Sequence, residues 1–150
     1  MKKKLLLAAA ILGLSVVSYA QEDAKGPILT FEETDFNFGF FDQEHAKQSH
    51  YFKFTNTGDA PLVISDATAT CNCTVPEYPK HEIAPGATDS IKVSYDGSTK
   101  RPGVFRKVIT VSYNGKTISE AFARVTITGE MVDKEVAEQI KELDAEYKKE

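Results

Sequence analysis

Apolar and polar residues alternate with a period of two through most of this 150-residue chain, and clusters of Gly, Pro, Asn and Asp interrupt the alternation. Successive side chains of a β-strand point to opposite faces of the sheet, so this period is typical of strands with one buried face. The pattern therefore predicts an all-β fold, and its strand number suits a two-sheet sandwich. Seven strands are expected, at residues 28–31, 37–40, 50–56, 62–69, 90–95, 105–113 and 117–128.

The same alternation predicts which side chains face the core. Turn residues agree with the segmentation: Asn114-Gly115 between two alternating runs predicts a two-residue hairpin with positive φ at both positions. Pro85-Gly86 predicts a type II turn with Gly86 at positive φ. The expected core consists of Phe52, Phe54, Ile91, Val93, Tyr95, Ile109, Val111, Tyr113, Ala123, Val125 and Ile127.

The first 20 residues have the three parts of a signal peptide. Three Lys at residues 2–4 precede an apolar run at residues 5–17, and Ser18-Tyr19-Ala20 places small residues at both cleavage-defining positions. This run is shorter than the roughly 20 apolar residues that span a bilayer. We therefore expect a cleaved signal peptide at residues 1–20, a β-sandwich domain at residues 21–129 and a C-terminal helix or tail at residues 130–150.

The expected mature protein is periplasmic or secreted and soluble, with no transmembrane segment. It is not expected to be a lipoprotein, because residue 21 is Gln rather than the Cys that would carry the lipid. Removal of the three leader Lys takes 18 basic residues to 15 against 22 acidic ones, a formal charge of −7. Nucleic-acid-binding proteins neutralise phosphates with clustered Lys and Arg, so nucleic acid is not an expected partner.

The pattern changes after Gly129, where apolar residues recur at spacings of three and four among Lys and Glu. This spacing predicts an amphipathic helix. A helix of this length is marginal in water on its own, so its apolar stripe is expected to pack on its own domain, on a second copy or on another protein, unless it frays. The stripe consists of Val132, Val136, Ile140, Leu143 and Tyr147.

Five sequence blocks follow one another in a fixed order: DFNFG at 35–39, FKFTNTG at 52–58, PLVI at 61–64, CNCTVPEYP at 71–79 and IAPG at 83–86. In this order they resemble the bacterial exported family known as domain of unknown function 1573. The resemblance implies an immunoglobulin-like sandwich, similar to chaperone-like and sperm-protein-like binding modules, and implies no activity. Together with the seven expected strands, it predicts a seven-stranded immunoglobulin-like sandwich with a C-terminal amphipathic helix. Where the family usually has Gly between the two Cys, this chain has Asn72, which tolerates a left-handed turn better than other non-Gly residues.

The chain has two cysteines, Cys71 and Cys73, and an exported protein meets conditions in which thiols tend to be oxidised. Residues two apart in a straight strand have Cα atoms about 6.5 to 7 Å apart, so a disulfide would need a bend at Asn72. A bond that closes so small a loop would be a local lock or a redox element. Alternatively, the thiolates bind Cu(I) or Zn²⁺ together with His81, or both side chains are inert core residues.

Tyr78 lies between Pro76 and Pro79, and it either closes the end of the sandwich or presents a stacking surface to a partner. The sequence contains no HExxH helix, phosphate-binding loop, dinucleotide-binding fingerprint or nucleophile elbow. We therefore expect no enzymatic activity and no cofactor. The expected function is a binding module of the bacterial envelope, whose partner is another envelope protein or a second copy bound through the C-terminal helix. The alternative is a thiol-redox or soft-metal protein that uses the Cys-x-Cys pair.

Overall fold

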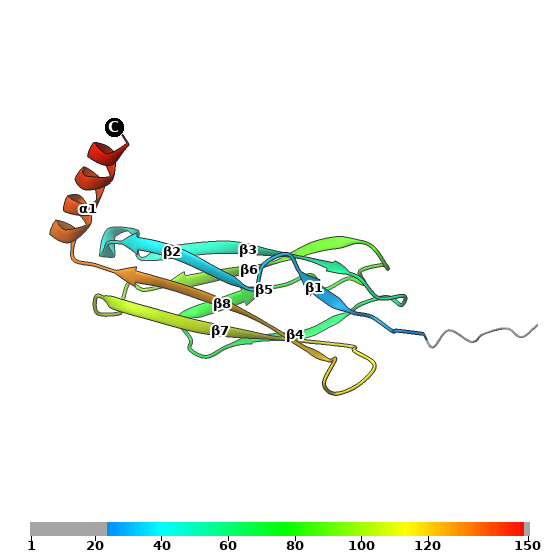
Figure 1. Ribbon diagram of the computed structural model, residues 1–150. Helices are drawn as coiled ribbons and strands as arrows, with labels where there is room; N and C mark the ends of the chain where they lie inside the picture. Colours follow the sequence, from blue (N-terminus) through cyan, green and yellow to red (C-terminus); the bar gives the residue numbers. More distant parts are fainter. Residues whose placement is uncertain (1–23, 149–150) are drawn as a thin grey trace, which may run out of the picture.

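The computed structural model describes residues 24–148, so the predicted signal peptide lies outside the described residues. Two four-stranded sheets pack face to face and a single α-helix follows the last strand (Figure 1). The elements are β1 (Leu29–Phe31), β2 (Asp35–Phe41), the 3-10 turn η1 (Gln43–His45), β3 (Lys47–Asn56), β4 (Ile64–Ala69), β5 (Thr74–Glu77), β6 (Thr88–Asp96), β7 (Gly103–Tyr113), β8 (Phe122–Met131) and α1 (Lys134–Tyr147).

The first two strands belong to different sheets. Sheet A has the order β1-β3-β6-β5 and sheet B has the order β2-β8-β7-β4. The chain crosses from one sheet to the other at residues 32–34, which places β1 antiparallel to β3 and β2 parallel to β8. The other strand pairs are antiparallel. This arrangement confirms the predicted all-β sandwich with a C-terminal helix.

Residues 24–148 form eight strands rather than the expected seven, because the prediction missed β5. This strand pairs with β6, and Pro76 lies opposite Val93 in the register. Proline lacks the N–H that a central strand needs, so its presence argued against a strand here. β5 is an edge strand of sheet A, where one side of the backbone has no neighbouring strand and proline is tolerated.

β7 and β8 do pair as an antiparallel hairpin, but the predicted two-residue turn at Asn114-Gly115 is wrong. Residues 114–121 join β7 to β8, so the last strand begins at Phe122 instead of Thr117. Neither residue has a positive φ. The Asn114 side chain instead accepts a hydrogen bond of 2.8 Å from the Val63 backbone N–H, which ties this loop to the segment before β4.

The predicted turn at Pro85-Gly86 is confirmed. Gly86 has a φ of 77°, and the Ala87 backbone N–H donates to the Ala84 carbonyl oxygen at 3.0 Å. These are the features of a type II turn, in which the third residue needs a positive φ.

The core lies between the two sheets. All the expected core residues are buried except Ala123, which is half-buried against them. Leu62 and Met131 are also buried, although neither is among the expected core residues. Asn56 is a fully buried polar residue, and its side chain makes hydrogen bonds to four backbone groups. The core is therefore mainly apolar, with the satisfied amide of Asn56 at its β1 end.

Candidate functional site

The Cys-x-Cys turn connects two edge strands, β4 of sheet B and β5 of sheet A. The Thr74 backbone N–H donates to the Cys71 carbonyl oxygen at 3.2 Å and closes the turn. The Cα atoms of Cys71 and Cys73 are 5.3 Å apart and their sulfur atoms are bonded at 2.00 Å. The chain therefore bends here by enough to bring the pair within disulfide range. The bend does not use the left-handed conformation that Asn72 would tolerate, because no non-glycine residue in 24–148 has a positive φ.

The disulfide is one of the three alternatives that the sequence left open, and the sulfur atoms of a disulfide are not thiolate ligands for a metal. The structure does not bring His81 to them. Its Nε2 atom lies 3.1 Å from Asp89 Oδ2, and Asp89 is six residues from Tyr95, the register neighbour of Thr74 on β6. Six strand residues span about 20 Å. Within the described residues, no group of three or more His, Cys, Asp or Glu side chains is suited to hold a metal ion.

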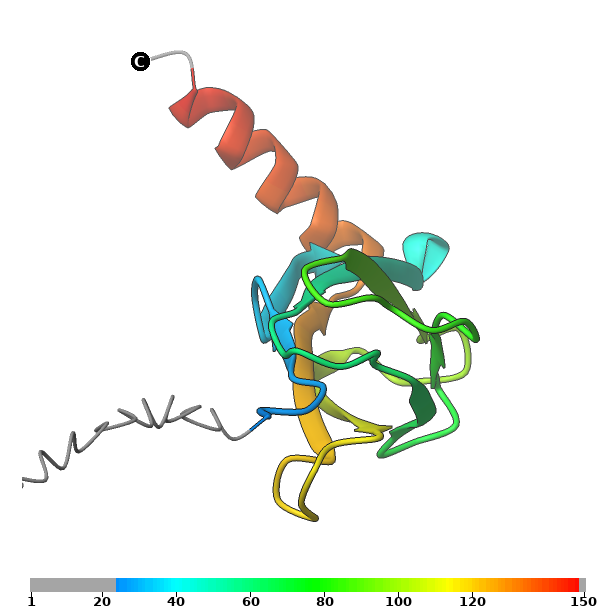
Figure 2. The ribbon, with the colours of Figure 1, turned by 90° about the vertical axis from the view of Figure 1, so that its right-hand side faces the viewer.

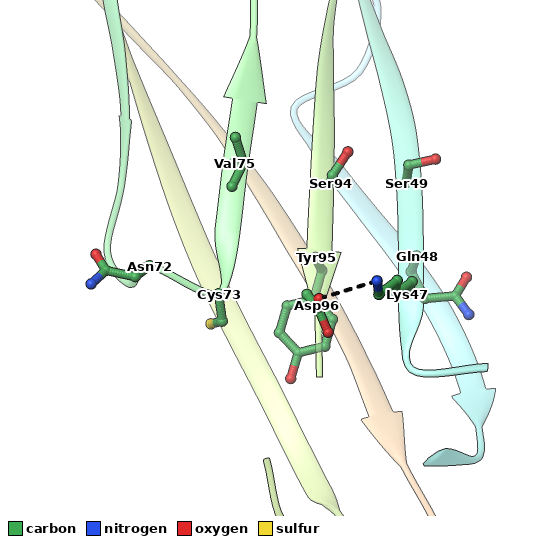
Figure 3. Close-up of a pocket in the computed structure, with 9 residues that line it drawn as sticks. All are labelled: Lys47, Gln48, Ser49, Asn72, Cys73, Val75, Ser94, Tyr95 and Asp96. Carbon is green, nitrogen blue, oxygen red and sulfur yellow. Dashed lines mark ion pairs between the residues drawn. The ribbon is translucent and has the colours of Figure 1, made fainter. Parts of the chain in front are cut away.

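Cys73 borders two adjoining depressions, with volumes of about 410 and 230 Å³. The larger one extends across β5, β6 and β3 on the outer face of sheet A, from Val75 to Lys47 (Figure 3). Lys100 lines the smaller one. Asp96 lines both depressions, and Lys47 Nζ lies 3.7 Å from its Oδ2 atom. The disulfide turn is therefore the corner of a surface that carries two ammonium groups and one carboxylate.

The surroundings of the disulfide also include a buried hydroxyl. Thr74 is 4% exposed, and its Oγ1 atom lies 3.6 Å from Cys71 Sγ and 3.9 Å from Cys73 Sγ. Near the depressions, hydrogen bonds from the Ser98 hydroxyl and backbone N–H lower the pKa of Asp96. Asp96 is thus ionised at neutral pH and pairs with Lys47. Cys71 and Cys73 were predicted as candidate site residues from the sequence. No sequence pattern indicated that Thr74 and Asp96 are their neighbours.

Tyr78 lies just beyond β5 and connects the two sheets. Its hydroxyl donates to the carbonyl oxygen of Ser65 on β4 at 3.1 Å, and Lys80 Nζ lies 3.3 Å above its ring. Because its hydroxyl and one ring face are already in contact, the geometry favours the role of closing the sandwich over that of a free stacking surface. A shallow depression of about 320 Å³ lies beside it and includes His81.

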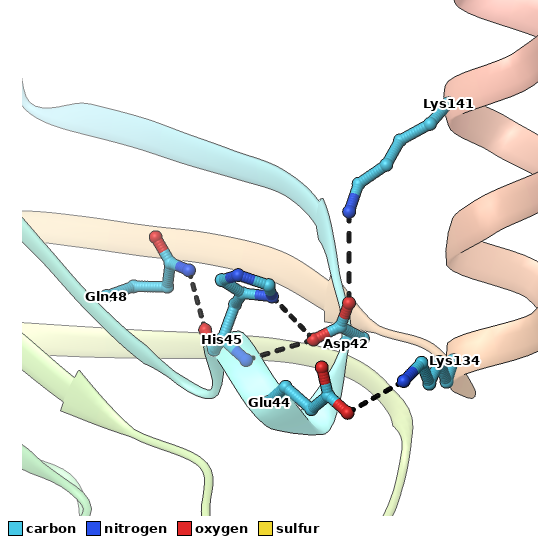
Figure 4. A network of polar contacts seen from close by, with 6 residues as sticks. All are labelled: Asp42, Glu44, His45, Gln48, Lys134 and Lys141. Atoms are coloured by element: carbon cyan, nitrogen blue, oxygen red, sulfur yellow. Dashed lines mark hydrogen bonds and ion pairs between the residues drawn. The ribbon is translucent and has the colours of Figure 1, made fainter.

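Helix α1 is attached to the sandwich by one side. Ala137 is buried, Lys134 Nζ lies 2.9 Å from Glu44 Oε1, and Lys141 Nζ lies 4.0 Å from Asp42 Oδ2 (Figure 4). Beyond these contacts the helix projects away from both sheets, as a quarter turn of the molecule shows (Figure 2). Two lysines and one alanine therefore anchor the helix at its first turns.

Asp42 is the buried member of this anchor. Its Oδ1 atom accepts a hydrogen bond of 2.9 Å from the His45 backbone N–H and lies 2.8 Å from His45 Nδ1. These contacts with His45, the side-chain one above all, lower the pKa of Asp42 although burial opposes the shift. The sequence predicted the helix, but the partners Asp42 and Glu44 carried no recognisable signal because they lie far from it along the chain.

Most of the predicted apolar stripe is not covered by the sandwich. Val132 is buried just before the helix and Ile140 is half-buried. Val136, Leu143 and Tyr147 are 41%, 66% and 82% exposed. Packing of the whole stripe on its own domain is therefore not observed. No helix in the part of the chain that the structure describes is long and apolar enough to cross a membrane.

The two packed sheets, with β1 in one and β2 in the other, define an immunoglobulin-like and PapD-like β-sandwich domain. Residues 29–131 match the family described as protein of unknown function DUF1573. The match covers more than half of the chain, and the protein belongs to this family. The resemblance predicted from the sequence blocks is thereby confirmed. No curated protein matches the chain.

Solved structures share the fold at low sequence identity. A protein of unknown function from Porphyromonas gingivalis W83 has a TM-score of 0.62 and 18% identity, over 74% of this chain and 50% of that one. PapD-like domain 7 of human CEP192 has a TM-score of 0.57 and 5% identity, over 87% and 99%. The secreted serine protease VesC from Vibrio cholerae has a TM-score of 0.52 and 13% identity, over 70% and 23%. The chain thus spans half of the Porphyromonas protein and less than a quarter of VesC.

Proposed function

We propose that this protein is a non-catalytic binding module of the bacterial envelope, exported through its signal peptide at residues 1–20. The sandwich acts as a rigid support and α1 presents the contact surface to a partner. The likeness to PapD-like domains supports an interaction role, because domains of this architecture recur as binding modules. The exposed stripe on an anchored helix is the observation that carries the proposal.

The anchoring of α1 is what makes the stripe a usable surface. An isolated helix of 14 residues is marginal in water. Here Lys134 and Lys141 hold one side of the helix to the sandwich, so Leu143 and Tyr147 remain exposed on an ordered element. An amphipathic helix that presents apolar side chains at spacings of three and four fits a hydrophobic groove of a partner.

The charges of the helix favour a different protein over a second copy as the partner. Residues 134–148 carry three Lys and five acidic residues. Asp144 and Glu146 flank the apolar positions, so two copies packed along this stripe would both place acidic groups at the interface. The surface is complementary to an apolar groove with a basic rim, and we therefore assign it to another envelope protein.

A pair of glutamate substitutions tests this surface. Leu143→Glu places a charge in the stripe, whereas Ala145→Glu places the same charge two residues further on, about 200° around the helix. Purified mature protein, wild type or variant, is cross-linked in envelope extract and its adducts are identified by mass spectrometry. We expect Leu143→Glu to lose the adducts that wild type and Ala145→Glu share.

Equal adducts for both variants would contradict the role of α1. Sedimentation of the mature protein with and without residues 132–150 tests the second-copy alternative. A dimer that disappears when these residues are removed would assign the stripe to self-association instead.

A further inference from the structure

We propose that the Cys71–Cys73 disulfide is a thiol-exchange centre that oxidises pairs of cysteine thiols in polypeptides held against the outer face of sheet A. The proposed binding function does not use this bond. The inference is independent of the role of α1, because it depends only on the turn between β4 and β5 and on the two depressions beside it.

The bond contributes little to holding the fold together. It joins residues separated by a single residue, so it removes little conformational freedom from the unfolded chain. The same turn is already closed by the hydrogen bond from Thr74 N–H to the Cys71 carbonyl oxygen. The flanking strands are fixed by their pairing with β7 and β6. The disulfide can therefore open without the loss of either sheet.

The two sulfur atoms differ in their surroundings. Cys71 is partly exposed, whereas Cys73 is 9% exposed. An incoming thiolate therefore attacks Cys71 Sγ, and Cys73 Sγ is the leaving group. A leaving thiolate in a buried position needs a cation or a hydrogen-bond donor. Thr74 Oγ1, 3.9 Å from Cys73 Sγ, can supply the hydrogen bond, and Lys47 and Lys100 line the depressions that Cys73 borders.

The exchange balances without a further redox partner. The first substrate thiolate forms a bond to Cys71 Sγ, the Cys71–Cys73 bond breaks, and Cys73 leaves as a thiolate that takes up a proton from solvent. The second substrate thiolate, having lost its proton to solvent, attacks the first substrate sulfur and releases Cys71. The substrate gains one disulfide and loses two electrons, and the protein takes up these two electrons as two thiols. Each oxidised protein molecule makes one substrate disulfide.

The shape of the larger depression indicates the substrate class. It is about 410 Å³ in volume and lies across three strands beside the turn. Ser49, Ser94 and Val75 stand in one row across these strands, so the floor is shallow and has short side chains. Such a surface accommodates several residues on either side of a cysteine in an extended polypeptide, whereas the tripeptide glutathione has only one residue on each side.

The test follows thiol oxidation by intact mass, with an unstructured reduced peptide that contains two cysteines as the probe. Oxidised wild-type protein is compared with an oxidised synthetic peptide that copies residues 69–77 and has the same disulfide without the fold. In the absence of oxygen we expect the protein to gain two hydrogens, the probe to lose two, and the protein to react at least about tenfold faster than the copied peptide. Equal rates for the two would overturn the proposal.

Two further measurements use the same probe chemistry. With the disulfide form of the probe, we expect Cys73→Ser, which retains Cys71, to accumulate a mixed disulfide faster than Cys71→Ser. The reverse order would refute the assignment of Cys71 as the attacked sulfur.

The second measurement compares the rate at which the protein oxidises glutathione with the rate at which it oxidises the two-cysteine probe. Oxidation of glutathione as fast as of the probe would refute a polypeptide substrate. The wild-type comparison needs no variant, so a folding defect in either variant leaves it valid.

Discussion

The side-chain nitrogen of Asn56 lies 3.0 Å from the carbonyl oxygen of Ile83 and donates a hydrogen bond to it in the fully buried interior. The same nitrogen donates to the Ala60 carbonyl oxygen at 2.8 Å, and Asn56 Oδ1 accepts from the backbone N–H groups of Gly58 and Ile28. One amide thus joins the start of β1, the loop after β3 and the segment before β6. All four partners are backbone groups, and pairing them takes both donors and the acceptor oxygen of an amide.

Asn56→Leu is expected to lower the free energy of unfolding by about 3 kcal/mol, because it leaves buried carbonyl and N–H groups without partners. Urea unfolding followed by circular dichroism measures the loss. Asn56→Asp should be at least as destabilising, since it replaces two donors by a buried carboxylate. Asn72→Asp is the control, an identical change at an exposed asparagine, and should shift stability by less than about 0.5 kcal/mol. Similar losses at both positions would contradict the role of Asn56.

Gly58 is required because the chain passes directly against it. A Cβ atom at Gly58 would overlap the Gly26 carbonyl oxygen and lie 2.6 Å from the Ile28 backbone nitrogen. Gly58→Ala should therefore push β1 away and cost about 2 kcal/mol. Gly39→Ala is a matched contrast, because Gly39 has a φ of 70° with open space around it and should cost about 1 kcal/mol from backbone conformation alone.

Hydrogen exchange distinguishes the two glycine effects. Gly58→Ala should speed exchange in the residues around β1, where the Thr57 N–H donates to the Ile28 carbonyl oxygen at 2.9 Å. Gly39→Ala should leave β1 protected. If Gly58→Ala left β1 protected, the close approach of these backbones would not be what excludes a side chain.

The alternating pattern predicted the buried faces because β3 pairs with β6, and β7 with β8, in a continuous register over long stretches. The pattern could not predict that β1 and β2 join different sheets, because that depends on which strand lies beside each one. It missed β5, which has four residues and contains Pro76. At Asn114 the local hairpin signal was overridden by hydrogen bonds to Val63 and Pro61.

The candidate site was predictable to different degrees. Cys71 and Cys73 are two residues apart, so the sequence alone placed them within possible reach of one another. The anchor between Lys134 and Glu44 joins residues 90 positions apart, and no local pattern contains that contact. The exposure of Leu143 also depends on where the anchors hold the helix. The helix could therefore be predicted, but not the face that it presents.

Removal of the disulfide should leave a folded protein. Loop-closure entropy for three residues amounts to about 1.6 kcal/mol, which is the expected stability loss for the double variant Cys71→Ala, Cys73→Ala. Reduction of the wild-type protein should give a similar shift in the urea midpoint and leave the β-sheet circular dichroism spectrum unchanged. Unfolding on reduction would show that the bond is a structural staple, in conflict with a site that opens in use.

Lowering the pH should weaken the contacts that Asp42 makes with His45 and Lys141. The folded-state pKa of Asp42 is lowered, so this carboxylate stabilises the folded state at pH values above its ordinary pKa of 3.8. The contribution diminishes as the pH falls below this value and is lost as the pH passes through the lowered pKa. Protonated Asp42 is a weaker acceptor for His45 and no longer pairs with Lys141.

Amide exchange of η1 and α1, measured between pH 6 and pH 2 and corrected for the intrinsic rate, tests this dependence. Protection of both elements should be constant down to about pH 4 and then decrease. Asp42→Asn should have lower protection at pH 6 and a flatter profile, because the asparagine does not titrate. Asp59 and Asp96 also have lowered pKa values, but they are present in both proteins and affect both profiles alike. Parallel profiles for wild type and Asp42→Asn would therefore show that Asp42 does not couple the helix to the sandwich.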